Sequence, residues 1–201
     1  MSDRIFFIIA GLAAFAMVAL GLLPGMNQLP SGPVSGGNTD YSRVEIRGDQ
    51  LNRLVAGGES TIQLIEEDGE KLLYIEMAFD QVINDPQRNP HFVLATDLET
   101  MFAGRNLRVT VEARAADRYG AQEMQLNYAL GNAEASGWQS FTLTKQFRAS
   151  SFMYEVPPKN VGSEPGYDYL AIRPVVPEKE RALLVRSVVF EPLGPVRASG
   201  D

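Results

Sequence analysis

The sequence predicts an all-β fold, an antiparallel β-sandwich of about ten strands with the topology of a jelly roll or another Greek key, preceded by one transmembrane helix. Three observations lead to this prediction: an apolar run at Ile5–Leu23, a stretch rich in Gly, Pro, Ser and Asn after it, and short segments of alternating polarity from Tyr41 onward. Closely spaced short strands, separated by turn residues and with almost no helical periodicity between them, are typical of antiparallel sandwiches.

The composition fits one folded domain of about 150 residues with an appendage. The net charge is −7, so nucleic acid and anionic membrane surfaces would repel the protein at long range, and we expect neither as its main partner. The chain contains no cysteine, which excludes disulfides, thiolate metal sites and a cysteine nucleophile. No cofactor is predicted.

The N-terminal run has the length of a membrane span. Residues 5–23 lack charged side chains, and as a helix they would extend about 28 Å, close to the roughly 30 Å of hydrocarbon in a bilayer. Pro24 and Gly25 are expected to end this helix. A cleaved signal peptide is the alternative, but its apolar region is normally about 7–15 residues and is followed by a small-x-small site. We therefore predict an uncleaved anchor whose partner is the lipid bilayer. Its main apolar side chains are Ile5, Phe6, Phe7, Leu12, Phe15, Leu20 and Leu23.

Charge around this helix predicts its orientation. Arg4 and the α-amino group precede the helix, and no Lys or Arg follows it until Arg43, so the positive-inside rule places the N-terminus in the cytoplasm. The predicted location is the inner membrane, single pass, with the body in the periplasm or outside the cell. The expected organisation is a cytoplasmic tip and transmembrane helix at 1–23, a flexible linker at 24–40, the sandwich at 41–195 and a loose tail at 196–201.

Three consecutive strands are predicted between Gly104 and Phe147, where apolar and polar side chains alternate most clearly. Asp68-Gly69 predicts a hairpin turn, because both residues accept positive φ angles. Its return strand is expected to place alternate residues from Leu73 to Phe79 on one face. The last strand, Ala182–Glu191, is almost entirely apolar and is expected inside a sheet.

Smaller features complete the fold prediction. Thr96 or Asp97 is expected to cap a helix of one or two turns that ends at Ala103. Tyr128 and Tyr154 share a strand face with apolar neighbours, and we expect both in the core.

Four segments resemble carbohydrate-binding modules of the galactose-binding-like jelly-roll type, and together they cover about Tyr41–Leu193. They are GRNLRVTVEAR (Gly104–Arg114), GWQSFTLT (Gly137–Thr144), YLAI (Tyr169–Ile172) and LVRSVVF (Leu184–Phe190). The resemblance implies the fold and a glycan ligand. The chain departs from the pattern at Arg186-Ser187, where such modules often carry acidic residues, and no motif locates the aromatic pair that stacks on sugar in that family.

Tyr119, Tyr167 and Trp138 are the candidate ligand-binding residues, because sugar binders present exposed aromatic faces. Tyr119 and Tyr167 lie in predicted loops, from which a ring can reach a ligand. Trp138, the only tryptophan, opens a strand. We favour its packing under an edge of the sandwich and keep ligand contact as the alternative.

No catalytic or metal site is predicted. Asp80, Asn84 and Asp85 offer oxygen ligands for Ca²⁺, but their spacing does not match a twelve-residue calcium loop, and a plain turn is favoured. His91 is the only histidine, and no G-x-S-x-G elbow or phosphate-binding glycine loop accompanies it. We therefore predict a protein that is not an enzyme.

Two functions follow from these features. The first is a membrane-anchored, exported binding module that contacts a polysaccharide or glycan of the cell envelope. The alternative is an accessory subunit of a membrane protein complex, docked through its helix and its sandwich. The small residues of the helix, Ala10, Gly11, Ala13, Ala14 and Ala16, would favour close contact with a membrane-protein partner.

Overall fold

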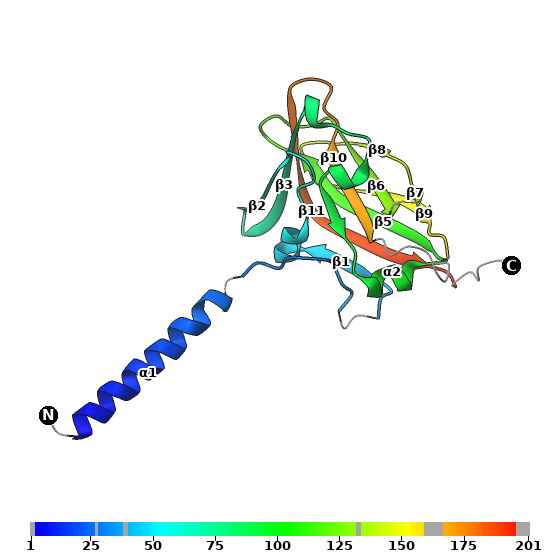
Figure 1. The fold of residues 1–201 in the computed structure, drawn as a ribbon. Coiled ribbons are helices and arrows are strands. Elements are labelled where there is room, and N and C mark those ends of the chain that lie inside the picture. The colour runs from blue at the N-terminus through cyan, green and yellow to red at the C-terminus, as the bar shows by residue number, and fades with distance from the viewer. Residues whose placement is uncertain (1–2, 27, 38–39, 132–133, 159–166, 196–201) are drawn as a thin grey trace. The chain divides into compact units, whose positions relative to one another are not determined.

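The computed structural model describes residues 3–26, 28–37, 40–131, 134–158 and 167–195. The chain divides into two compact units, Met1–Pro30 and Ser31–Asp201. We describe each unit by itself, and Figure 1 shows the elements of both.

The first unit is the helix α1 (Asp3–Met26), which continues past Pro24, where we expected it to end. The described side chains of α1 are exposed, and they include those of Ile5, Phe7, Leu12 and Phe15. The side chains of Phe6, Leu20 and Leu23 are not among those that the structure describes. Within the part of the chain that is described, no helix is both long and apolar enough to cross a membrane. The structure therefore does not support the predicted anchor at residues 5–23.

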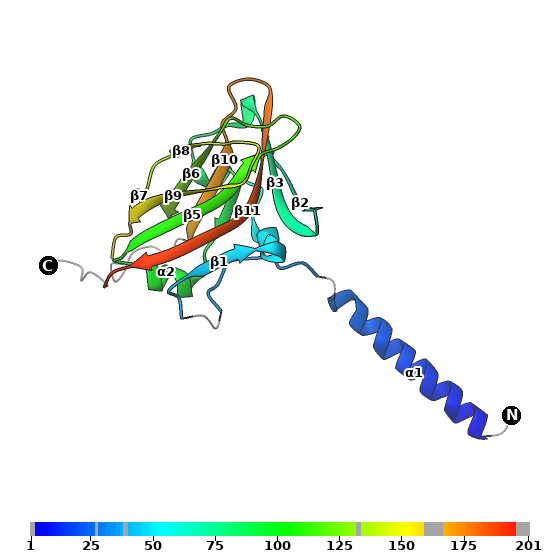
Figure 2. The same ribbon diagram turned by 180° about the vertical axis from the view of Figure 1, so that it is seen from behind.

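The second unit is a sandwich of two antiparallel sheets, as predicted, and Figures 1 and 2 show its two sides. The six-stranded sheet has the order β2-β3-β11-β5-β9, and β1 also pairs with β11. Its strands are β1 (Val44–Arg47), β2 (Thr61–Glu67), β3 (Glu70–Ala78), β5 (Asn106–Ala115), β9 (Arg148–Glu155) and β11 (Glu180–Leu193).

The five-stranded sheet has the order β4-β10-β6-β7, and β8 also pairs with β6. Its strands are β4 (His91–Val93), β6 (Glu123–Leu130), β7 (Glu134–Ala135), β8 (Gln139–Thr142) and β10 (Asp168–Pro174). The α-helix α2 (Thr96–Phe102) and three 3-10 helices, η1 (Gly48–Arg53), η2 (Phe79–Gln81) and η3 (Pro86–Arg88), complete the described elements.

Local sequence signals account for several of these elements. Asp68 (φ 52°) and Gly69 (φ 77°) form the predicted turn between β2 and β3. The apolar strand β11 lies inside its sheet, between β3 and β5, as expected. Phe79 is an error of the prediction: it leaves the strand for η2, and its side chain is 58% exposed.

The stretch from Gly104 to Phe147 is divided between the two sheets. β5 belongs to the six-stranded sheet, whereas β6 and β8 pair with each other in the five-stranded sheet. Each strand turns its apolar residues inward, such as Val109 of β5 and Leu126 of β6, both fully buried. The chain therefore crosses from one layer of the sandwich to the other within the stretch that shows the clearest alternation.

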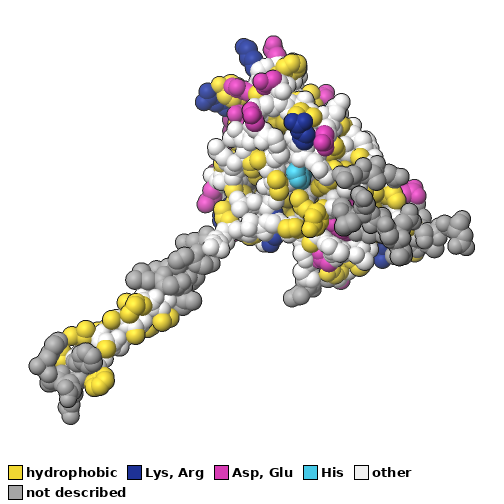
Figure 3. Space-filling view, in the orientation of Figure 1, with side chains coloured by type: hydrophobic (Ala, Val, Ile, Leu, Met, Phe, Trp, Pro, Cys, Tyr) yellow, Lys and Arg dark blue, Asp and Glu magenta, His cyan; other side chains and the backbone are white. Residues whose placement is uncertain are grey.

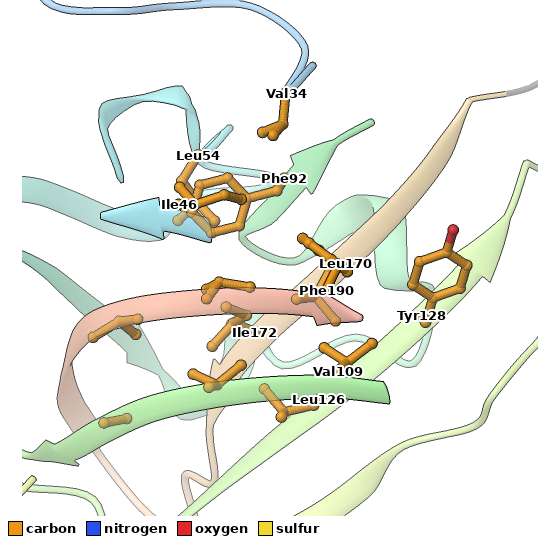
Figure 4. Packing of buried hydrophobic residues seen from close by; sticks show 14 of the residues in the cluster. Val34, Ile46, Leu54, Phe92, Val109, Leu126, Tyr128, Leu170, Ile172 and Phe190 are labelled. Atoms are coloured by element: carbon orange, nitrogen blue, oxygen red, sulfur yellow. The ribbon is translucent and has the colours of Figure 1, made fainter. Parts of the chain in front are cut away.

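The core lies between the two sheets, as Figure 4 shows. Phe190 of β11 stacks on Phe102 of α2 with their ring centroids 5.8 Å apart, and it meets the ring of Tyr128 edge-on at 6.5 Å. Tyr128 is fully buried, and Tyr154 packs against the core at a ring distance of 5.6 Å from it, so both tyrosines lie where we predicted. The Tyr128 hydroxyl donates to Asp168 Oδ2 at 2.9 Å.

Residues 31–37, which we call the strap, belong to the sandwich rather than to the flexible linker expected at 24–40. Val34 is buried and pairs with Leu94, beside the edge strand β4. The Asp97 carboxylate accepts hydrogen bonds from Ser35 Oγ at 2.7 Å and from the Gly36 amide at 2.9 Å. Thr96 or Asp97 was expected to cap α2, but the helix begins after Ala95 without a side-chain cap. The carboxylate of Asp97 holds the strap instead.

Asp97→Ala in the full chain is expected to lower the free energy of unfolding by about 1–3 kcal/mol, because charge-assisted hydrogen bonds are lost. Burial raises the pKa of Asp97, but the hydrogen bonds to its carboxylate outweigh burial and hold this pKa below 3.8. The stabilisation is therefore complete above the unfolded-state pKa and is lost as the pH falls through the folded-state pKa.

Urea unfolding between pH 7 and pH 2 measures this effect. The difference in the free energy of unfolding between the wild type and Asp97→Ala should become smaller as the pH falls. Asp80→Ala, at an exposed aspartate away from the strap, should change stability little at any pH. An Asp97→Ala variant as stable as the wild type at pH 7 would show that the carboxylate does not hold the strap.

Candidate functional site

The outer face of the five-stranded sheet carries a group of polar and aromatic side chains. Successive residues of a strand point to opposite faces. Leu170 and Ile172 of β10 and Leu126 of β6 belong to the core, so their neighbours in sequence lie on the outer face. That face is lined by His91, Gln125, Asn127, Tyr169, Ala171 and Arg173.

Strand register brings these residues into rows across three strands. Ala171 of β10 pairs with His91 of β4 on one side and with Asn127 of β6 on the other. Arg173 pairs with Gln125 in the next outward-facing row. Figure 3 shows this side of the sandwich, where a part of the single histidine of the chain is visible among hydrophobic side chains, although His91 is buried.

Trp138 packs on this face against Arg173. The guanidinium carbon of Arg173 lies 3.7 Å from the centroid of the Trp138 ring, well within the range of a cation–π contact. The indole Nε1 donates to the carbonyl oxygen of Asn84 at 3.0 Å. Trp138 is partly exposed and is not part of the apolar core cluster, and its ring packs on the outer face of the sheet rather than under the edge of the sandwich, where we favoured it.

Arg173 is 5% exposed, and neutral groups hold its guanidinium. Nε and Nη2 donate to Gln125 Oε1 at 2.9 and 2.8 Å, and Nη1 donates to the Ile83 carbonyl at 2.6 Å. Nη1 also lies 3.4 Å from Asn89 Oδ1. Burial lowers the pKa of Arg173 to about 10, and the guanidinium remains charged at neutral pH. These contacts fix the loop of residues 82–90 against the sheet.

Asn127 and His91 add further polar atoms to the face. Asn127 is 3% exposed, and its Oδ1 is buried without a hydrogen-bond donor among the described residues. His91 Nδ1 lies 2.8 Å from the Asn89 carbonyl, which can only accept, so Nδ1 carries a proton and donates. An unsatisfied buried acceptor costs about 1–3 kcal/mol, so Asn127 Oδ1 suits a hydroxyl or water donor.

Tyr167 directly precedes β10, where the alternation that turns Tyr169 outward directs Tyr167 to the same face, whereas Tyr119 lies elsewhere. Tyr167 is 61% exposed and precedes Tyr169 by two residues. Its carbonyl oxygen accepts a hydrogen bond from the Gly131 amide at 3.1 Å, which extends the hydrogen bonding between β6 and β10 by one residue pair. Tyr119 lies at the turn after β5, with φ 55°, and its carbonyl accepts from Ala182 of β11 in the other sheet. Of the three predicted aromatic residues, Trp138 and Tyr167 therefore share a face and Tyr119 does not.

Asp80, Asn84 and Asp85 have separate local roles. Asp85 accepts from the Gln87 amide at 3.0 Å and caps η3, the Asn84 carbonyl accepts from Trp138, and Asp80 is exposed in η2. Among the residues covered by the structure, no group of three or more His, Cys, Asp or Glu side chains is arranged to hold a metal ion.

Sequence reasoning missed Arg173, Gln125 and Asn127. The sequence could have indicated them, because the apolar residues of β6 and β10 mark the positions that face the core. The polar residues between those positions must then face outward. The sequence offers no sign that Arg173 meets Trp138, since Trp138 lies in the loop before β8 and Arg173 lies on β10, which does not pair with β8.

Comparison with known proteins identifies the fold. No protein-family model matches the chain, and no curated protein matches it. The tandem CBM22-1–CBM22-2 domain of Paenibacillus barcinonensis Xyn10C matches with a TM-score of 0.51 at 10% identity, over 72% of this chain and 43% of that one. The CBM22-1 xylan-binding domain of the same protein gives 0.49 at 10% identity, over 73% and 87%.

A third match is the CBM22-1–GH10 part of Clostridium thermocellum Xyn10B in complex with xylohexaose, with a TM-score of 0.46 at 9% identity, over 71% of this chain. The chain spans 26% of that protein's length. At such identities the likeness shows the fold alone. That fold is the β-sandwich jelly roll of carbohydrate-binding modules, which the sequence resemblance had implied.

Gln125→Leu is expected to lower the free energy of unfolding by about 2–3 kcal/mol, because it removes the acceptor of two N–H groups of the buried Arg173. Emission of the single tryptophan should also shift to longer wavelength as its stack on Arg173 loosens. Urea unfolding and fluorescence measure the two effects. Gln63→Leu, at an exposed glutamine of β2, is the matched control. Equal stability of the two variants would contradict a supporting role for Gln125.

Proposed function

We propose that this protein is a non-enzymatic glycan-binding module, and that the outer face of the five-stranded sheet is its binding face. The observation that supports this most directly is the partly exposed Trp138 ring, stacked on the buried Arg173 and flanked by outward-facing polar residues. An aromatic ring offers an apolar platform for the C–H face of a sugar, and neighbouring polar groups can bind its hydroxyls.

The platform is held in place before any ligand arrives. Trp138 is fixed on one side by Arg173 and at its Nε1 by the Asn84 carbonyl. Binding to a fixed ring avoids the cost of about 0.5–1.5 kcal/mol for ordering a mobile side chain. Tyr167, exposed on the same face, would extend the contact along the direction of β10, which suits a chain of sugars better than a single one.

The described outer face favours binding over hydrolysis. Its side chains are Arg, Gln, Asn, His, Tyr and Trp, whereas glycoside hydrolysis commonly requires two carboxyl groups flanking the scissile bond. A polysaccharide panel can begin with xylan, the ligand named for the Paenibacillus module. Localisation in the inner membrane and the alternative role as an accessory subunit rest on the sequence alone and stay predictions.

Trp138→Ala is expected to weaken polysaccharide binding at least about tenfold, a loss of about 1.4 kcal/mol, because the sugar loses its stacking surface. Tyr167→Ala should weaken binding by a smaller factor, and Tyr119→Ala, at a ring away from this face, should leave it unchanged. Affinity electrophoresis across the panel, followed by calorimetry on the best ligand, measures these effects.

Trp138→Phe serves as the matched control, since it keeps an aromatic platform and should retain part of the affinity. Circular dichroism establishes that each variant is folded. The proposal fails if the wild type binds no polysaccharide of the panel, or if Trp138→Ala binds as tightly as the wild type.

A further inference from the structure

Arg173 is a buried cation without a carboxylate partner in the part of the chain that the structure describes. Burying an ion costs several kcal/mol unless an opposite charge or a full set of hydrogen bonds compensates. The acceptors around Arg173 are the side-chain oxygens of Gln125 and Asn89 and the carbonyl of Ile83, all of them neutral.

Arg114 in the other sheet shows the usual arrangement. It is also 5% exposed, but its Nη2 lies 2.8 Å from both carboxylate oxygens of Glu67, and its Nη1 lies 3.2 Å from Asp117. Two equally buried arginines of one chain thus differ in whether a carboxylate neutralises their charge. Carboxylates of the same chain neutralise the charge of Arg114. The described residues around Arg173 provide no negative charge, so an anionic ligand could neutralise it.

Among the residues that the structure describes, the hydrogen-bonding capacity of Arg173 is also incomplete. A guanidinium has five N–H donors. Four contacts are present: one from Nε, two from Nη1 and one from Nη2. The remaining N–H is on Nη2. A carboxylate accepting there would be placed at the edge of the Trp138 stack, beside the sugar platform proposed above.

The described charged groups near this face do not neutralise Arg173. Asp85, in the loop packed on the sheet, is exposed, and its side chain accepts from the Gln87 amide. The paired residues on β6 and β4, Gln125, Asn127 and His91, carry no negative charge. The net charge of −7 slows the approach of an anion but does not prevent its binding, because charges are screened beyond roughly 8 Å at physiological ionic strength.

We infer that the glycan bound at this face is acidic, a polysaccharide carrying uronic-acid carboxylates, and that one carboxylate binds at Arg173. The inference rests on the proposed function and names its ligand class. The carboxylate of the glycan supplies the negative charge that the described residues around Arg173 do not provide. The guanidinium donates a charge-assisted hydrogen bond to that carboxylate. Trp138 then sets where the sugar lies, and Arg173 selects among sugars of the same shape.

A matched pair of ligands tests this inference on the full-length wild type. One ligand is a xylan substituted with glucuronic acid, and the other is the same xylan after reduction of its carboxyl groups to alcohols. Calorimetry should give at least about tenfold tighter binding of the acidic form. Raising NaCl from about 0.05 to 0.5 M should weaken binding of the acidic form and leave the reduced form almost unchanged.

Variants assign the preference to Arg173. Arg173→Met keeps the length of the side chain without its charge, and it should bind the acidic and the reduced form with equal affinity. Both affinities should be lower than those of the wild type, because the guanidinium that supports the Trp138 ring is also lost. Arg114→Met removes an equally buried charge in the other sheet and should retain the preference. Arg173→Lys keeps the charge and should retain part of it. Circular dichroism and urea unfolding establish that each variant is folded.

The outcomes separate the two proposals. Binding of neither form would overturn the proposed function and this inference with it. Equal binding of both forms by the wild type would leave the proposed function standing and overturn the inference. A preference for the acidic form that survives in folded Arg173→Met would also overturn it, since the carboxylate would then be recognised elsewhere.

Discussion

The packing of two sheets face to face is the interaction on which the rest of the structure depends. Phe190 and Val109 from one sheet meet Leu170 and Ile172 from the other in a core that excludes water. Since side chains alternate along a strand, burying one set of residues forces the next set outward. The polar face of the five-stranded sheet is therefore a direct consequence of the core, and it is as rigid as the strands that carry it.

The polar groups on that face depend on one another. Gln125 fixes the guanidinium of Arg173, the guanidinium supports the ring of Trp138, and the ring anchors the loop through the Asn84 carbonyl. A buried cation would be costly alone, and the neutral acceptors offset only part of that cost. The result is an aromatic platform that is fixed but still partly exposed, which a purely apolar packing of Trp138 would not give.

Several predictions failed at positions where a side chain serves a distant segment. Asp97 has the residue type of a helix cap, yet its carboxylate binds the strap some sixty residues earlier in the chain. The strap has the composition of a linker, but Val34 supplies an apolar side chain that the core accepts. Phe79 continues an alternating pattern, but the strand ends one residue before it. Local composition indicates only the structure that a segment would adopt in isolation. Asp97 and Val34 instead contact residues that are distant in sequence, which local composition does not reveal.

The sequence by itself determined most of the strands, the turn at Asp68-Gly69, the interior position of β11 and the antiparallel sandwich, because alternation and turn chemistry act over a few residues. It also determined which residues of β6 and β10 must face outward. The tertiary structure decided what those residues meet. Trp138 bonds to Asn84 across 54 positions of the chain, and Arg173 bonds to Ile83 across 90. Such contacts depend on how two sheets and a loop are placed in space, and no local pattern encodes that placement.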